Sequence, residues 1–265
     1  MILNHRIVGD GPRQVVFLHG LFGQGRNWNA IARGITDIAT AYLVDLPNHG
    51  RSPWTSEFTL DNQAEAVAGW LQRTFTTPIV LVGHSLGGKL AMRIALRWPE
   101  LVDRLMVVDI SPVATTETSE FEYLIAALKS LDLDNLTSRA AANAFLEPKI
   151  PNPSVRGFLL QNLRQHEGSW FFTCNLDLLG RSLPEVGSWP PIDGTFYGVT
   201  YWIAGGRSPY IQPEHAPVMR ALFPHVISMT LKDASHWVHS DAPEAITATL
   251  RHMMAADRLS QGSQS

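Results

Sequence analysis

Residues 79–88 contain the pattern Gly83-His84-Ser85-Leu86-Gly87 directly after the apolar run Ile-Val-Leu-Val. A Gly-x-Ser-x-Gly pattern between a buried strand and a helix is typical of a nucleophile elbow, a tight turn that exposes the serine hydroxyl. The turn brings neighbouring backbone close on both sides of the serine, so the flanking positions favour residues without a Cβ atom. The pattern therefore predicts that Ser85 is a nucleophile at the carboxyl end of a strand.

The segments on both sides of the pattern agree with this interpretation. Residues 79–82 form a continuous apolar run, as in a parallel strand that is covered on both faces. After the pattern, Leu86, Leu90 and Ile94 share one helical stripe, and Pro99 marks where the helix ends. The alternative is a serine in an ordinary glycine-rich turn between a strand and a helix.

Strand-like runs alternate with helical patterns along much of the chain. The expected strands span residues 15–18, 41–44, 79–82, 104–109, 199–204 and 226–231. Besides the helix after Ser85, the expected helices span residues 27–35, 60–75, 214–223 and 243–254. Alternation of this kind predicts an α/β fold, with a mostly parallel, doubly wound sheet and helices on both of its faces.

The alternation is interrupted once. From Pro112 to about Pro191 helical stripes and aromatic residues dominate and no strand is evident, which predicts an inserted helical cap over residues 112–191. The α/β core is then built from residues 1–111 and 192–258. A short tail rich in serine and glutamine, residues 259–265, is expected to be flexible.

Composition excludes several classes of protein. The 265 residues carry a net charge of −3 with both signs dispersed, so we expect no nucleic-acid partner. No run approaches the roughly 18 apolar residues of a membrane span, and residues 1–14 lack the pattern of a secretory signal. We therefore expect a cytoplasmic protein without stable membrane insertion. Cys174 is the only cysteine, which excludes an internal disulfide, and a buried apolar role is expected for it rather than a nucleophilic one.

Six stretches of the sequence together resemble the YbfF-type esterase branch of the α/β-hydrolase superfamily, which is related to a mitochondrial hydrolase of the same branch. The stretches are His19-Gly20-Leu21-Phe22-Gly23, Asn48-His49-Gly50-Arg51-Ser52, Gly83-His84-Ser85-Leu86-Gly87-Gly88-Lys89, Val108-Asp109-Ile110-Ser111-Pro112-Val113, Gly205-Gly206-Arg207-Ser208-Pro209-Tyr210 and His236-Trp237-Val238-His239. Because they extend from residue 19 to residue 239, the resemblance covers nearly the whole chain. It implies the α/β-hydrolase fold and a nucleophile, acid and base in the order serine, acid, histidine.

A serine hydroxyl needs a base that takes its proton. In this superfamily the base is a histidine after the last strand, and His236 matches that position. His239 is the alternative, but it lies three residues further on, where a helix is expected to begin. Two other histidines of the matching stretches, His19 and His84, are expected to brace the oxyanion loop and the elbow.

The acid departs from the common pattern of the superfamily. Most members carry it in the loop after the strand that corresponds to residues 199–204, in a Gly-x-x-Asp arrangement. Here that loop reads Gly-Gly-Arg-Ser, no carboxylate precedes Glu214, and Ser208 stands where an aspartate would be expected. Asp109 ends the strand after the elbow helix, and a carboxylate at that edge of the sheet can also reach the histidine. The resembling branch places its acid there too.

We therefore expect a triad of Ser85, Asp109 and His236. One alternative is that Asp109 only caps a turn before Ser111. The other is that Asp233, three residues before His236, is the acid.

The resemblance also predicts the groups around the triad. The oxyanion hole requires two backbone N–H donors, one after the nucleophile and one after the His-Gly strand end, and Leu86 and Leu21 occupy those positions. Phe22 and Trp237 are expected to line the substrate pocket. No metal or other cofactor is expected, because His236 and His239 alone do not make a metal site.

Three functions are compatible with these residues. The first is a serine esterase or thioesterase that cleaves short- to medium-chain acyl groups through an acyl-enzyme. The second is a lyase of the same fold that resembles a menaquinone-pathway enzyme, although that enzyme keeps its acid in the later loop. The third is a non-catalytic binding protein of this fold, which often loses a triad member, whereas all three candidates are present here. The oligomeric state is not indicated.

Overall fold

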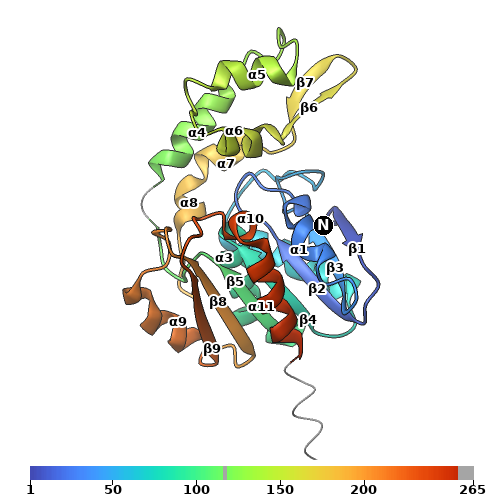
Figure 1. The fold of residues 1–265 in the computed structure, drawn as a ribbon, viewed down its shortest axis with the longest axis vertical. Helices are drawn as coiled ribbons and strands as arrows, with labels where there is room; N and C mark the ends of the chain where they lie inside the picture. The colour runs from blue at the N-terminus through green and yellow to red at the C-terminus, as the bar shows by residue number, and fades with distance from the viewer. Residues whose placement is uncertain (116–117, 256–265) are drawn as a thin grey trace, which may run out of the picture.

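A seven-stranded sheet forms the centre of the computed structural model, which describes residues 1–115 and 118–255 (Figure 1). The strands lie in the order β1-β3-β2-β4-β5-β8-β9, and neighbours pair in parallel except β1, which is antiparallel to β3. They span β1 His5–Val8, β2 Arg13–Leu18, β3 Ala39–Val44, β4 Ile79–His84, β5 Val102–Val108, β8 Val199–Gly205 and β9 Val226–Leu231. The predicted α/β fold with a mostly parallel sheet is confirmed. The tail expected over residues 259–265 lies outside the described residues.

The sheet separates two apolar cores. Because successive side chains of a strand point to opposite faces, Val15 and Phe17 of β2 belong to one core, whereas Val16 and Leu18 belong to the other. The helices of the first core are α1 Asn29–Arg33 and α11 Pro243–Ala255, and those of the second are α2 Leu60–Thr74, α3 Leu86–Arg97 and α9 Ala216–Leu222. Three 3-10 turns, η1 Gly25–Trp28, η2 Pro99–Leu101 and η3 Pro213–His215, and the short helix α10 Val238–Asp241 connect these elements.

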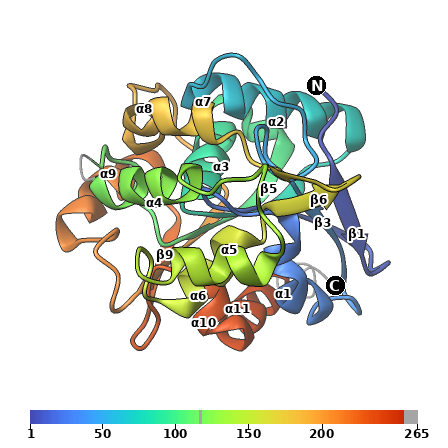
Figure 2. The same ribbon diagram turned by 90° about the horizontal axis from the view of Figure 1, so that it is seen from above.

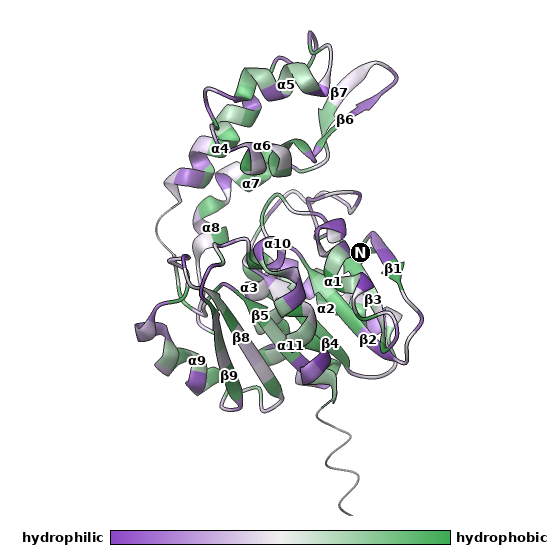
Figure 3. Cartoon of the chain, in the orientation of Figure 1, coloured by the Kyte–Doolittle hydropathy of each residue, from purple (hydrophilic) through white to green (hydrophobic). Residues whose placement is uncertain are grey.

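Hydropathy follows this arrangement. Figure 3 shows the central strands coloured as hydrophobic, whereas purple residues gather on the outer helices and loops. Burial of apolar residues between the layers is therefore the main stabilising contribution. Among the described residues, no helix is both long enough and apolar enough to cross a bilayer.

Between β5 and β8 the chain leaves the sheet, and the described parts of residues 112–191, which we call the cap segment, form a further layer whose apolar residues continue the second core. Its described elements are α4 Ser119–Lys129, α5 Arg139–Leu146, α6 Pro153–Leu160, β6 Leu163–His166, β7 Ser169–Phe172, α7 Leu176–Arg181 and α8 Leu183–Gly187. Figures 1 and 2 show this segment lying over one end of the sheet, the end at which the parallel strands finish.

The expectation that residues 112–191 contain no strand was wrong. Strands β6 and β7 form an antiparallel hairpin in which Leu163 pairs with Phe172. Its two-residue turn, Glu167 and Gly168, has positive φ at both positions (49° and 85°), as a hairpin turn of this length requires. Each strand has only four residues, too few for a clear alternation of polar and apolar positions.

Two buried cations of α3 hold the end of the cap segment. The ammonium group of Lys89 donates to the carbonyl oxygens of Gly187 (2.6 Å) and Ser188 (2.8 Å). One turn later, Arg93 donates to the carbonyl of Pro190 (3.0 Å) and pairs with Asp61. Both cations are almost fully buried, and burial lowers the pKa of Lys89 to about 7. The side chains of Lys89 and Arg93 are thus covered by residues 187–190, where the chain returns from the cap segment.

Where β2 crosses the junction between β4 and α3, the backbone segments approach so closely that glycine is required. A Cβ atom on Gly83 would lie 2.3 Å from the carbonyl oxygen of Gly87, and one on Gly87 would lie 2.4 Å from that of Leu18. Both atoms belong to backbone, which cannot move aside as a flexible side chain would. The absence of these two Cβ atoms therefore allows Ser85 to sit close to the end of β2.

We expect Gly87→Ala to lower the free energy of unfolding by about 1–3 kcal/mol or more, because the added methyl group overpacks a backbone crossing. Urea denaturation followed by circular dichroism measures this. Gly157→Ala is the matched control: Gly157 lies within α6 with nothing within 4 Å of the added Cβ. There the same change should raise stability by about 0.5–1 kcal/mol through helix propensity. Equal effects of the two substitutions would contradict the close-approach argument.

Candidate active site

Ser85 lies between β4 and α3 in a strained backbone conformation. Its φ is 51° and its ψ is −119°, values that few non-glycine residues adopt. Its N–H donates to the carbonyl of Val108 on the neighbouring strand (3.1 Å), and its Oγ lies 3.1 Å from Nε2 of His236. Ser85 thus presents its hydroxyl to a histidine from the loop after β9.

His236 is held on several sides. Its Nδ1 lies 2.7 Å from Oδ2 of Asp109, and its carbonyl oxygen accepts a hydrogen bond from Nε2 of His84 (2.8 Å). The ring of Tyr210 stacks on the imidazole, with centroids 4.1 Å apart and 28° between the planes. Because a carboxylate only accepts hydrogen bonds, Nδ1 of His236 carries the proton and Nε2 is free to accept the proton of Ser85.

Asp109 is fully buried and follows directly after β5. Its Oδ1 accepts from the N–H of Gly205 (2.8 Å), and its Oδ2 accepts from His236 and from the hydroxyl of Ser208 in a close contact. Ser208, at the position where an aspartate would be expected, therefore donates a hydrogen bond to Asp109. The alternative acid Asp233 is exposed.

Residues 20–23 form a tight turn beside Ser85. The N–H of Gly23 donates to the carbonyl of Gly20 (2.9 Å), and Phe22 has a φ of 61°. The N–H of Phe22 donates to Nε2 of His49 (3.2 Å), so this donor already has a partner. The neighbouring residue, Leu21, lines the same hollow as Ser85 and Leu86. Leu21 and Leu86, the two residues expected to supply oxyanion donors, thus lie beside the same hollow as Ser85.

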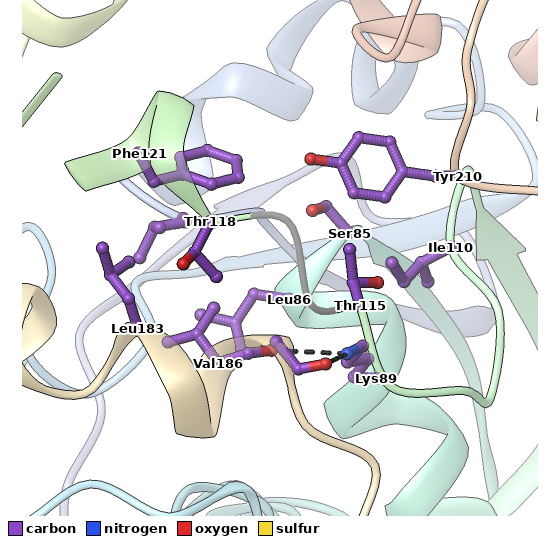
Figure 4. Close-up of a pocket in the computed structure, with 12 residues that line it drawn as sticks. Ser85, Leu86, Lys89, Ile110, Thr115, Thr118, Phe121, Leu183, Val186 and Tyr210 are labelled. Carbon is purple, nitrogen blue, oxygen red and sulfur yellow. Dashed lines mark hydrogen bonds between the residues drawn. The ribbon is translucent and has the colours of Figure 1, made fainter. Parts of the chain in front are cut away.

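An apolar hollow lies between Ser85 and the cap segment (Figure 4). It has an empty volume of about 420 Å³, and its walls include Leu86, Ile110, Phe121 and Leu183. A second, larger hollow lies on the side of His236 and is lined by Trp237 together with polar side chains such as Glu120, Arg207 and Gln212. Tyr210 borders both hollows.

The two expected pocket residues differ in their placement. Trp237 lies on the wall of the larger hollow, and its ring contacts that of Phe158 in α6 (4.4 Å between centroids). Phe22 is buried, and its ring centroid lies 6.2 Å from that of Phe121, which is itself a wall of the hollow beside Ser85. Phe22 thus packs next to a wall residue.

Four buried histidines, His19, His49, His84 and His239, pack around the Gly20–Gly23 turn and the elbow at Ser85. Nε2 of His19 accepts from the N–H of Leu46 (3.0 Å) and its Nδ1 donates to the carbonyl of Gly20 (2.8 Å). Burial lowers the pKa of His19 to about 4, of His49 to about 3 and of His239 to about 4, and it also lowers that of His84. All four are therefore neutral at pH 7. Sequence reasoning missed the role of His49, although it lies in one of the six matching stretches.

His239 and Cys174, the alternatives for the base and the nucleophile, make their contacts elsewhere. The ring of His239 packs against those of His84 (4.5 Å) and Trp28 (4.9 Å). Cys174 is buried, and burial raises the pKa of its thiol to about 12, which leaves it protonated and unreactive. Within residues 1–115 and 118–255, no three His, Cys, Asp or Glu side chains are grouped to hold a metal ion.

Comparison with known proteins agrees with this geometry. Residues 15–249 match the model of the alpha/beta hydrolase family. The chain is 38% identical over 236 residues to the sn-1-specific diacylglycerol lipase ABHD11 of Mus musculus, covering 87% of this chain and 77% of that protein. It is 27% identical over 240 residues to the esterase YbfF of Escherichia coli, covering 91% and 92% of the two chains. A solved marine microorganism esterase, 29% identical, superposes with a TM-score of 0.92 over 95% of this chain and 99% of that one.

The buried histidines predict how stability depends on pH. An unfolded histidine binds a proton near pH 6.5, whereas His19, His49 and His239 resist protonation down to about pH 4 or 3 when folded. Between these values the unfolded state binds more protons, so the free energy of unfolding falls as the pH falls below about 6.5. Each such histidine contributes up to about 1.4 kcal/mol per pH unit.

Urea denaturation between pH 7.5 and pH 5 measures this slope. His49→Asn should flatten the slope by up to one proton, whatever it does to stability at pH 7. His166→Asn removes an exposed histidine at the end of β6 and should leave the slope unchanged. An equal slope in wild type and His49→Asn would contradict the assignment of His49 as buried and neutral.

Proposed function

The chain belongs to the alpha/beta hydrolase family and is an ester hydrolase of that family, and we propose that it cleaves short- to medium-chain acyl esters or thioesters through an acyl-enzyme on Ser85. One observation carries this proposal. An unbroken chain of contacts runs from Ser85 Oγ to His236 Nε2 (3.1 Å) and from His236 Nδ1 to Asp109 Oδ2 (2.7 Å). This is the geometry that a nucleophile, its base and an orienting carboxylate need.

In the first half of the reaction, Oγ of Ser85 attacks the acyl carbon while Nε2 of His236 takes its proton. The carbonyl electron pair moves onto oxygen, where the N–H groups of Leu21 and Leu86 stabilise the negative charge. The C–O or C–S bond to the leaving group then breaks, and His236 returns the proton to the departing alkoxide or thiolate. Asp109 remains ionised and stabilises the imidazolium that forms between these steps.

In the second half, water takes the place of the leaving group. His236 removes a proton from the water as it attacks the acyl carbon, the same two N–H groups stabilise the second oxyanion, and Ser85 leaves with the proton from His236. The products are a carboxylic acid and a free enzyme. The atoms balance with water as the only co-reactant.

The two hollows divide the substrate between them. The apolar hollow beside Ser85 is suited to an acyl chain, and its narrowness supports a short- to medium-chain preference. The larger and more polar hollow beside Trp237 then holds the alcohol or thiol part. In this proposal residues 112–191 act as a cap, and Phe22 supports the acyl wall through Phe121. The relative ABHD11 is named a diacylglycerol lipase, which is consistent with a substrate that is an ester of an apolar acyl chain.

The lyase of the same fold is a weaker alternative for this site. That enzyme keeps its acid in the later loop, where this chain has Ser208 donating to Asp109. Turnover of p-nitrophenyl acetate or butyrate supports ester hydrolysis, and parallel assays with acyl-CoA thioesters of the same lengths decide between oxygen and sulfur leaving groups. A chain inert to all of these compounds would favour the lyase.

Substitution of the three residues tests the proposed triad. Ser85→Ala should abolish both hydrolysis and labelling by a fluorophosphonate, because the attacking oxygen is lost. Asp109→Asn should lower kcat by on the order of 10⁴, as for the aspartate of the serine-protease triad, because it favours the wrong tautomer of the base. Asp233→Asn is the matched control and should be mild, since Asp233 is exposed. Persistent labelling of Ser85→Ala, or a larger loss for Asp233→Asn, would overturn the triad.

Substitution of Ser208 should lower kcat less than substitution of Asp109, because it removes only one hydrogen bond to the carboxylate. Ser208→Ala removes one of the three hydrogen bonds to Asp109 and leaves those from Gly205 and His236. A hydrogen bond to a charged group contributes about 1.5–3 kcal/mol, so kcat should fall roughly 10- to 100-fold. Steady-state kinetics on p-nitrophenyl butyrate measure this. Ser208→Thr, which keeps the hydroxyl, should recover most of the rate, and equal losses for both variants would contradict the hydrogen-bond role.

A further inference from the structure

We propose that Asn162 of the cap segment is a positioning residue for the oxyanion turn, so that cap contact is required for fast acyl transfer even when the substrate is too short to touch the cap. This inference rests on the proposed function, because it concerns the donors around Ser85. The observation behind it is a buried hydrogen bond between residues 140 positions apart: Nδ2 of Asn162 donates to the carbonyl oxygen of Phe22 at 2.7 Å.

Asn162 is fully buried, and its side chain makes hydrogen bonds to core residues across the interface between the cap segment and the core. Besides the bond to Phe22, its Oδ1 accepts from Nε2 of Gln24 at 2.9 Å. The amide therefore spans the loop on both sides of Gly23 and pairs a donor and an acceptor with the core. A buried amide that makes both bonds fixes the relative position of the two segments it joins.

The backbone of Asn162 is in turn fixed within the cap segment. Its N–H donates to the carbonyl of Leu159 at the end of α6 (3.1 Å). Its carbonyl accepts from the N–H of Thr173 (2.8 Å) and from the Thr173 hydroxyl (3.2 Å). Asn162 thus stands where α6 meets the hairpin, and any displacement of that junction moves the amide.

Phe22 is the residue in the turn that needs to be held. It occupies the third position of the Gly20–Gly23 turn with a φ of 61°, a conformation that costs a residue with a Cβ atom free energy. Its N–H is held by His49 (3.2 Å), and its carbonyl accepts from Asn162 (2.7 Å) and, at a longer distance, from Nε2 of Gln161 (3.4 Å). The core and the cap therefore restrain the two peptide groups of Phe22, one each.

Loss of the hydrogen bond to the carbonyl of Phe22 affects the reaction by displacing the N–H of Leu21. The peptide that joins Leu21 to Phe22 rotates when Phe22 relaxes towards negative φ, and the N–H of Leu21 lies one residue away. An oxyanion donor acts at 2.7–3.1 Å from the developing charge, and a displacement of about 1 Å costs on the order of 10² in rate. The effect falls on the transition state, since the neutral carbonyl of the bound ester depends less on this donor.

Asn162→Asp is the first variant to test. It preserves the size of the side chain and an acceptor for Gln24, but it places a carboxylate oxygen against the carbonyl of Phe22 where Nδ2 donated. We expect kcat for p-nitrophenyl acetate to fall roughly 10- to 100-fold with KM changed little, because only the oxyanion donor is displaced. Asn162→Leu, which removes the donor without adding charge, should show a loss of the same kind.

Arg181→Gln is the matched control. Arg181 donates to the carbonyl of Ser56 (3.2 Å), another hydrogen bond between the cap segment and the core, away from the oxyanion turn. This variant loosens the same interface and should retain the wild-type kcat. Circular dichroism at the assay temperature verifies that all three variants are folded.

Two readouts separate positioning of the donor from shaping of the acyl hollow. First, the loss in kcat should be the same for acetate, butyrate and octanoate esters. Second, an alkyl boronic acid, whose adduct with Ser85 carries the oxyanion, should bind the Asn162 variants more weakly by the factor lost in kcat/KM, whereas the acid product should bind as to wild type. A loss that grows with acyl length and appears in KM, or unchanged boronate affinity, would overturn the inference.

Failure of the proposed function can be distinguished from failure of the positioning role of Asn162. If Ser85→Ala retains hydrolysis, the proposed function is wrong. If Ser85→Ala is inactive and the Asn162 variants keep wild-type kcat and boronate affinity, only the positioning role is wrong. Should Asn162→Leu unfold, Asn162→Asp and the control Arg181→Gln still decide the question: the former should lose kcat and the latter should not.

Discussion

The buried carboxylate of Asp109 is the group on which the site depends. A charge removed from water must be compensated by hydrogen bonds, and Asp109 receives them from the N–H of Gly205, the hydroxyl of Ser208 and the ring of His236. These donors belong to the end of β8, the loop that follows it and the loop after β9. One charge therefore draws three segments to the same edge of the sheet, and the ring of His236 is oriented by its hydrogen bond to this charge.

Strain is concentrated at the same edge. Phe22, Ser85 and Asp109 each have a positive φ between 51° and 61°, and each ends or follows a parallel strand. Conformations of this kind cost about 1–3 kcal/mol each and persist only where neighbouring contacts hold them. Here the contacts are backbone hydrogen bonds from adjacent strands and loops, as from Asp109 to Ile203 (2.8 Å). The stable sheet thus supports local geometry that a free loop would not keep.

Local patterns in the sequence predicted the sheet, and they placed Asp109 at the carboxyl end of one of its strands, because both depend on near neighbours. Apolar runs marked the central strands, and the absence of a carboxylate near Ser208 directed attention to Asp109. The contacts that complete the site are non-local. No periodicity links Ser208 to Asp109, or Asn162 to Phe22, since each pair meets only after the fold has formed. The hairpin β6–β7 and the edge strand β1 were missed for another reason: four-residue strands carry too short a pattern to detect.

The links between cap and core also constrain how a substrate enters. On one side Lys89 donates to the carbonyls of Gly187 and Ser188, and on the other the amide of Asn162 pairs with Phe22. Lifting the whole cap would exchange these hydrogen bonds for hydrogen bonds to water, at a net cost of about 0.5–1.5 kcal/mol each. The larger hollow beside Trp237 reaches His236 without breaking either link. Under the function proposed above, an ester that enters through that hollow binds while the hydrogen bond from Asn162 to Phe22 stays intact, so entry does not require the cap to swing open.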